Sequence, residues 1–219
     1  MRARIPLALA AAVVAASFTL STVGASSGSA MPAAGKAAAA PMPLYSGLGP
    51  VHHQVTTASP LAQKYFDQGL AFTYGFNHLE GERSFEQAAR IDPHMSMAYW
   101  GIALVLGPNY NLPQDQESGK QAFEAIKRAR SLEHGAASQE RDLIDALGQR
   151  YGSDGKESAA LDQAYATAMR EVAHRYPDDL DVQTLFAESL MDLHPWQLWS
   201  RDGKPGTDTI EIVKRSRRC

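Results

Sequence analysis

The residue types best suited to metal chemistry lie in two short stretches of the chain. His52 and His53 are adjacent, and a second group comprises His94, Met95 and Met97. Imidazole nitrogen and thioether sulfur are soft ligands that Cu(I) favours, so this set could hold copper. Two adjacent histidines rarely bind one ion together, however, and methionine commonly fills hydrophobic cores. We therefore predict no metal site and no cofactor, with a copper site as the alternative.

Beyond the predicted signal peptide, the sequence contains none of the short motifs that carry a catalytic mechanism. Residues 31–219 lack Gly-x-Ser-x-Gly, His-Glu-x-x-His, a Walker loop, a dinucleotide fingerprint and Cys-x-x-Cys. The many carboxylates fit the solvated faces of amphipathic helices, and the sequence brings no pair of them into a cleft. The single cysteine, Cys219, permits neither an internal disulfide nor a cysteine-based zinc site. We predict a protein that is not an enzyme.

The charge distribution argues against a nucleic-acid partner. The chain has 24 acidic and 21 basic residues, and six of the bases lie in its first four or last six positions. The body is therefore acidic, whereas a nucleic-acid binder needs a basic surface to release counterions from phosphate. A basic cluster over 214–218 could contact a membrane surface. No apolar helix face accompanies it, so a frayed end is the simpler explanation. The acidic body favours basic partners.

The first 30 residues are typical of a secretory signal peptide. Arg2 and Arg4 precede an apolar stretch over 5–23, and small residues before Ala25 and Ala30 match the pattern that signal peptidase accepts. We predict an exported protein, periplasmic or extracellular, without stable membrane insertion after cleavage. A signal that is retained as a membrane anchor is the alternative, because the apolar stretch approaches the length that spans a bilayer.

A helical region follows a predicted flexible linker over 31–58, which begins with many Ala, Pro and Gly residues. Ser59 and the proline after it form a typical helix start. Asn77, and either Asp179 or Asp181, can cap later helices. Apolar residues recur at helical spacing from here to residue 213, with turn signals between segments. We therefore predict an all-α domain over 59–213, built from antiparallel helix hairpins.

The first hairpin has the spacing of a known repeat. It carries, in order, Tyr65, Gly69, Phe72, Phe85, Ala88 and Pro93. This pattern resembles the tetratricopeptide repeat, a 34-residue helix pair in which the glycine lets the helices approach and the aromatic residues fill the space between them. Gln68 and Gly81 depart from the consensus. The pattern returns from Tyr99 onward, with insertions in the later units.

Three longer stretches resemble one particular family: VTTASPLAQKYFDQGLAFTYGFNHLEGERSFEQAARIDP, MAYWGIALVLGPNYN and RYPDDLDVQTLFAESLMDLHPWQLW. They look like exported bacterial tetratricopeptide-repeat proteins of largely unknown role, over residues 47–213. The resemblance implies a right-handed solenoid of about three and a half hairpins, acting as a non-catalytic binding scaffold for a peptide or protein partner. In such relatives more repeats follow, so the basic tail at 214–219 suggests a truncation or a shifted reading frame. The alternative function is a fragment of an exported enzyme or copper-handling protein whose site needs those repeats.

By the same resemblance, the first helix of each pair lines a concave groove that binds the partner. The side chains expected to line it are Gln63, Phe66, Leu70, Thr73, Met97, Trp100 and Leu104. Phe66 and Trp100 would anchor a bound peptide or partner helix. The alternative is that these side chains pack against a neighbouring helix or against the loop 107–113. That loop carries Asn109 and Asn111, which could take part in binding or simply form turns.

Overall fold

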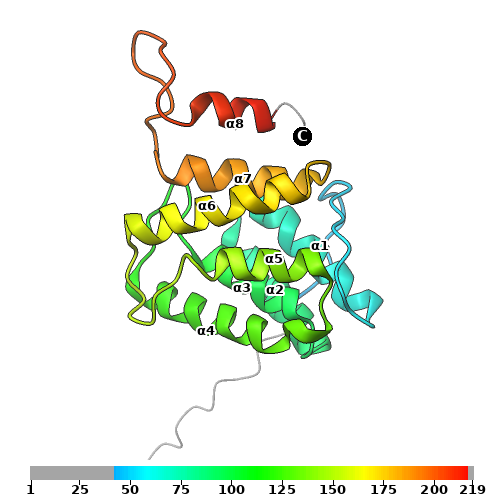
Figure 1. Ribbon diagram of the computed structural model, residues 1–219. Helices are drawn as coiled ribbons and strands as arrows, with labels where there is room; N and C mark the ends of the chain where they lie inside the picture. Colours follow the sequence, from blue (N-terminus) through cyan, green and yellow to red (C-terminus); the bar gives the residue numbers. More distant parts are fainter. Residues whose placement is uncertain (1–41, 217–219) are drawn as a thin grey trace, which may run out of the picture. The chain divides into compact units, whose positions relative to one another are not determined.

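The computed structural model describes residues 42–216, and within them the chain forms eight α-helices. The predicted signal peptide and the linker residues up to 41 lie outside the described residues, as do residues 217–219. In chain order the helices are α1 (Pro60–Tyr74), α2 (His78–Ile91), α3 (Ser96–Leu106), α4 (Gln116–Leu132), α5 (Ser138–Leu147), α6 (Ala159–Arg175), α7 (Leu180–Asp192) and α8 (Thr209–Ser216) (Figure 1). The prediction of an all-α domain is confirmed. Within this part of the chain, none of the helices has the length and apolar character needed to cross a membrane.

Successive helices pack against one another along the chain. α1 contacts α2, α2 contacts α3 and α3 contacts α4, and the same holds for α5 with α6, α6 with α7 and α7 with α8. α5 joins the two groups because it also contacts α3 and α4. Figure 1 shows α6, α7 and α8 lying side by side in that order. Sequential neighbour packing of this kind is consistent with a helical array.

Short polar side chains fix the first residue of several helices. The Ser59 hydroxyl accepts a hydrogen bond from the Ala62 amide at 3.2 Å, and Asp179 accepts one from the Val182 amide at 2.9 Å. Each bond satisfies an amide that the first helical turn leaves unpaired. The Ser59 cap is as predicted from the sequence, and of the two candidates Asp179 and Asp181, Asp179 is the cap. Asn77 also precedes its helix as predicted, but its side chain makes no capping hydrogen bond.

The first three helices meet around the ring of Phe85, which is fully buried. A β-carbon placed on Gly69 of α1 would lie 2.5 Å from this ring, and one placed on Gly101 of α3 would lie 2.4 Å from it. A side chain at either position would therefore overlap the ring. The predicted role of Gly69 is confirmed. Phe72, which we expected to fill the same space, is half-buried and packs edge-on against Tyr45.

Residues 42–58 form no helix or strand, yet they pack against the helices. The side chains of Met42 and Val55 are buried. The Tyr65 hydroxyl donates to the Met42 carbonyl at 2.5 Å, and the Gln68 amide donates to the Pro43 carbonyl at 3.0 Å. Burying apolar side chains is favourable, so these contacts hold the segment in place. The prediction of a flexible linker is therefore corrected for residues 42–58.

The helix α8 extends into the predicted basic tail. Lys214 and Ser216 continue this helix, which packs on α7 and buries Ile212. The Arg215 guanidinium donates to the side chain of Gln183 at 2.9 Å and lies 5.3 Å from the centre of the Phe186 ring. The prediction that the chain is frayed from residue 214 onward is therefore corrected as far as Ser216.

Candidate functional site

The seven side chains predicted to line a groove are all buried, which corrects the prediction of an open concave face. They are Gln63, Phe66, Leu70, Thr73, Met97, Trp100 and Leu104, and the most accessible, Gln63, keeps 9% of its surface exposed. The ring of Phe66 lies 5.4 Å from that of Phe85 and 6.4 Å from that of Trp100. These residues therefore belong to the core around α1, α2 and α3, as the alternative interpretation held. Whether the protein binds a partner elsewhere stays a prediction.

The physical reason for this burial is the size of the apolar side chains on this face. Leaving each of them in water would cost about 1.5–3 kcal/mol, so other parts of the chain cover them. The Trp100 indole donates to the Leu143 carbonyl of α5 at 3.2 Å. Gln63 and Phe66 lie against His53, which precedes α1. Thr73 lines a cavity of about 250 Å³ between α1 and α7.

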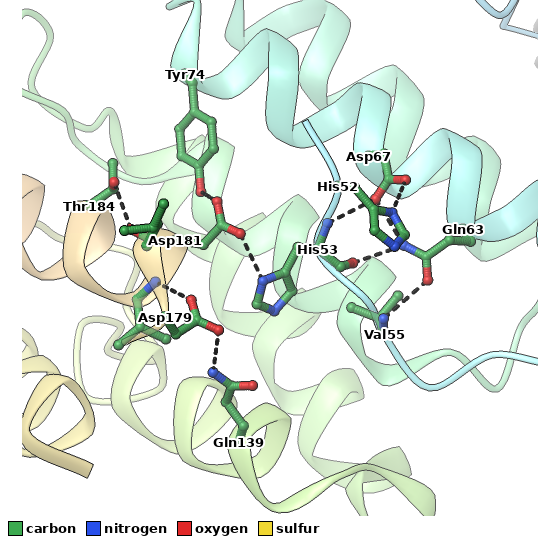
Figure 2. Close-up of polar contacts among 12 residues, drawn as sticks. His52, His53, Val55, Gln63, Asp67, Tyr74, Gln139, Asp179, Asp181 and Thr184 are labelled. Carbon is green, nitrogen blue, oxygen red and sulfur yellow. Dashed lines mark hydrogen bonds and ion pairs between the residues drawn. The ribbon is translucent and has the colours of Figure 1, made fainter. Parts of the chain in front are cut away.

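Residues 52–57, here called the docked segment, are held through their main chain by side chains of two helices. Gln63 of α1 donates to the His53 carbonyl at 2.8 Å and accepts from the Val55 amide at 3.1 Å. Asp67 of α1 accepts from the His53 amide at 3.3 Å, and Glu140 of α5 accepts from the amide of the residue after Val55. Figure 2 shows Gln63 and Asp67 reaching this part of the segment. Side chains of α1 and α5 thus supply the hydrogen bonds that main-chain amides and carbonyls would otherwise make within a strand or helix.

The two histidines of the docked segment each meet a carboxylate. His52 Nδ1 lies 2.8 Å from Asp67 Oδ2, and His53 Nδ1 lies 2.9 Å from Asp181 Oδ2 in the first turn of α7 (Figure 2). Burial alone would lower the pKa of His53, but the hydrogen bond and charge of Asp181 outweigh it and hold that pKa above its ordinary value. Burial would raise the pKa of Asp181, but hydrogen bonds from His53 and Tyr74 lower it. The charged forms are therefore favoured, and the ion pair ties the segment to α7.

His53, Asp179 and Asp181 also form a group that could hold a metal ion. Each offers a ligand atom, and these atoms lie within 4.8 Å of one another. One imidazole and two carboxylates suit a divalent ion such as zinc. Donors already occupy the carboxylates, because Asp179 accepts from Gln139 at 2.7 Å and Asp181 accepts from Tyr74 at 2.7 Å and from His53 (Figure 2). An ion would have to replace the bond between His53 and Asp181, so the prediction of no metal site stays our prediction.

The residues of the alternative copper site lie in different surroundings. His52 and His53 face different carboxylates, as described above. Met95 and Met97 are fully buried in the core, and His94 is exposed. The two methionines therefore fill the hydrophobic core.

A second polar cluster surrounds Arg150, which follows α5 and is buried. Its Nε donates to Asp162 of α6 at 3.2 Å, and its Nη2 donates to Oδ2 of Asp192 in α7 at 2.7 Å. The guanidinium also lies 4.9 Å from the centre of the Tyr165 ring. The other oxygen of Asp192, Oδ1, is buried and has no hydrogen-bond partner among the described residues. Burying a carboxylate oxygen without a hydrogen-bond donor is costly.

Two carboxylates one turn apart on α7 have raised pKa values. Burial raises the pKa of Glu188 to about 7, and the nearby charge of Asp192 adds to this effect. Burial likewise raises the pKa of Asp192 to about 6, against the opposing effect of Arg150. Perturbed carboxyl groups of this kind occur both at functional sites and in structural ion-pair networks.

A cavity of about 290 Å³ lies beside Arg150. The loop 107–113 lines one side of it, and the other side is formed by Arg150, Glu157, Asp162, Asp192, Pro195 and Trp196. The sequence singles out this loop because of Asn109 and Asn111. Asn109 Oδ1 accepts from the Asn111 amide at 3.0 Å, so the pair forms a turn, and both residues also line the cavity. No pattern in the sequence marks Arg150 or Asp192, because isolated charged residues on helical segments are ordinary.

No family model matches this chain, and no curated protein or solved structure shows significant similarity to it. The established description is therefore an all-helical domain whose eight helices, within residues 42–216, pack in consecutive pairs.

Proposed function

We propose that the protein is a non-catalytic binding scaffold, a tetratricopeptide-repeat-like array that holds a peptide segment of a partner protein. One observation carries this proposal: the array already holds residues 53–56 of its own chain through side chains of α1 and α5. A partner segment would take the place of the docked segment. The site differs from the predicted groove, since Phe66 and Trp100 are buried in the core. Of the predicted residues, Gln63 contacts the docked segment through hydrogen bonds.

The contacts favour a peptide because they are made to the main chain. Gln63 satisfies one carbonyl and one amide, and Asp67 and Glu140 each accept from an amide. Such bonds are available from any peptide of suitable conformation, whatever its side chains. Sequence preference would come from the pocket of Val55 and from the acids beside the two histidines.

The charges around the docked segment favour a basic partner. Asp67 faces His52, and Asp181 faces His53. Thr57 donates to Asp92 at 2.6 Å, and Glu140 contacts the segment between these points. Electrostatic complementarity of this kind steers association and selects partners. We therefore propose a partner segment with Lys, Arg or His at the two positions occupied by the histidines.

Competition with the chain's own segment provides the test. A segment tethered to its site competes at an effective concentration of roughly millimolar order, so weakening it should open the site. We would measure fluorescence anisotropy of a labelled peptide of residues 50–58 with the full chain. Val55→Ala should increase binding of this peptide, because it weakens only the competing segment. Adding Gln63→Ala to the Val55→Ala protein should decrease binding again, because it removes contacts from the site itself when the chain's own segment already competes less.

Thr56→Ala is the matched control, since this exposed residue contacts the array through its main-chain amide. It should leave peptide binding unchanged. Circular dichroism would establish that each variant keeps its helices. A folded Val55→Ala protein that binds no more peptide than the unaltered chain would contradict the proposal, because the segment would then be a permanent part of the fold.

We further propose that the protein is exported, on the basis of residues 1–30 alone. Mass spectrometry of the protein from the producing bacterium tests this. Export predicts a mature N-terminus directly after Ala25 or Ala30 in the periplasmic or extracellular fraction, and an intact N-terminus in the cytoplasmic fraction would contradict it.

A further inference from the structure

We propose that the cavity between the loop 107–113 and the end of α7 binds an alkylammonium group, either of a small amine or of a lysine side chain. The site combines a buried acceptor without a donor, an excess of negative charge and a pair of aromatic rings. It is independent of the docked segment: Asp192 lies at the other end of α7 from Asp181, about 16 Å along the helix axis.

The acceptor is Oδ1 of Asp192. The side chain of this residue is 3% exposed and lines the cavity. Arg150 donates to Oδ2, whereas Oδ1 has no partner among the described residues. A protonated amine carries N–H donors and a positive charge, so it would supply what this oxygen lacks.

The charge of the lining favours a cation over an anion. Glu157, Asp162 and Asp192 contribute carboxylates, against the single guanidinium of Arg150. Arg150 is already engaged by Asp162 and Asp192, which leaves it little capacity to attract an anion. Glu157 accepts from the Gln114 amide at 2.8 Å.

Aromatic and apolar side chains at the cavity favour an organic cation over a metal ion. The rings of Tyr110 and Trp196 lie 5.1 Å apart, and 73% of the Trp196 surface is exposed. An ammonium group is attracted to the faces of such rings. Leu112 and the prolines at 108 and 113 supply apolar lining for a short alkyl chain. A calcium or magnesium ion would instead need a shell of oxygen ligands.

Isothermal titration calorimetry with n-butylammonium chloride at constant ionic strength tests the proposal on the full chain. Asp192→Asn should lower the affinity about tenfold, because a charge-assisted hydrogen bond is lost. Trp196→Ala should lower it roughly two- to fivefold, the effect of one exposed cation–π contact. Trp199→Ala is the matched control, because Trp199 is also exposed but does not line this cavity. This substitution should leave the affinity for butylammonium unchanged.

Two comparisons separate the parts of the proposal. Tetramethylammonium has charge but no N–H donor, so it should bind more weakly than butylammonium if Asp192 Oδ1 is the acceptor. N-acetyl-lysine methylamide should bind as butylammonium does if the cavity accepts lysine side chains, and should not bind if it takes free amines only. Absence of saturable butylammonium binding would overturn the proposal. So would equal losses in Trp196→Ala and Trp199→Ala, a comparison that holds even if Asp192→Asn fails to fold.

Discussion

Replacing Glu188 with glutamine should stabilise the protein above neutral pH and leave its stability unchanged in mild acid. Burial raises the pKa of this carboxyl group from 4.5 to about 7. Each pKa unit corresponds to 1.36 kcal/mol, so ionising Glu188 costs about 3 kcal/mol more in the folded protein than in the unfolded chain. Glutamine has nearly the same shape and does not ionise.

The direction of this change in stability follows from the difference in proton binding between the folded and unfolded states. A group whose pKa is raised on folding stabilises the folded state fully below the unfolded-state pKa, and this contribution is lost as the pH rises through the folded-state value. For Glu188 the window runs from 4.5 to about 7. Above it, Glu188→Gln should exceed the unaltered protein in free energy of unfolding by up to about 3 kcal/mol, an upper value because the titrations of Glu188 and Asp192 are coupled.

Urea unfolding followed by circular dichroism, at about pH 4 and about pH 8.5, measures this difference. Glu171→Gln provides the control, because Glu171 is exposed on α6 and its removal should change stability little at either pH. A Glu188→Gln protein that differs from the unaltered protein equally at both values, or is less stable at the higher one, would refute the reasoning. The carboxylate would then be better solvated or better paired than the structure indicates.

Two further outcomes follow from contacts described above. Gly101→Ala should lower the free energy of unfolding, because overpacking against Phe85 costs about 1–3 kcal/mol and the better helix propensity of alanine returns at most about 1 kcal/mol. Urea unfolding measures this loss. Gly135→Ala is the control, because a β-carbon there meets no other atom within 4 Å. His53→Gln should remove one pH-dependent contribution to the free energy of unfolding. Because the pKa of His53 is raised, its ion pair with Asp181 stabilises the folded protein fully below pH 6.5, and this contribution is lost as the pH rises through the folded-state pKa. The stability difference between the two proteins should therefore shrink at high pH, and a constant difference would count against the ion pair.

The sequence predicts the helices well because their signals are local. Ser59 and Asp179 mark helix starts through their own hydrogen bonds, and apolar spacing marks the buried faces. Gly69 and Phe85 are also recognisable, because their spacing in one hairpin decides whether the two helices can approach. Each of these features depends on residues that are close in sequence, so no knowledge of distant contacts is needed.

The candidate sites depend on distant contacts, and the sequence could not predict them. Residues 42–58 have the composition of a linker, yet they pack because α1 offers Gln63 and α7 offers Asp181. Arg150 and Asp192 meet only after three helical segments have packed. The prediction of an open groove failed for a related reason: periodicity identifies an apolar face but does not reveal which other part of the chain covers it.

The docked segment also changes how this array should fold. In a linear array each unit contacts only its neighbours, so unfolding can begin at either end and proceed stepwise. Here the contact between His53 and Asp181 spans 128 residues and joins the chain before α1 to the fourth helix pair. Loss of α7 therefore removes contacts from the opposite end of the domain. The two ends should then melt together in one cooperative transition, and the segment, although synthesised early, completes its contacts only after α7 has formed.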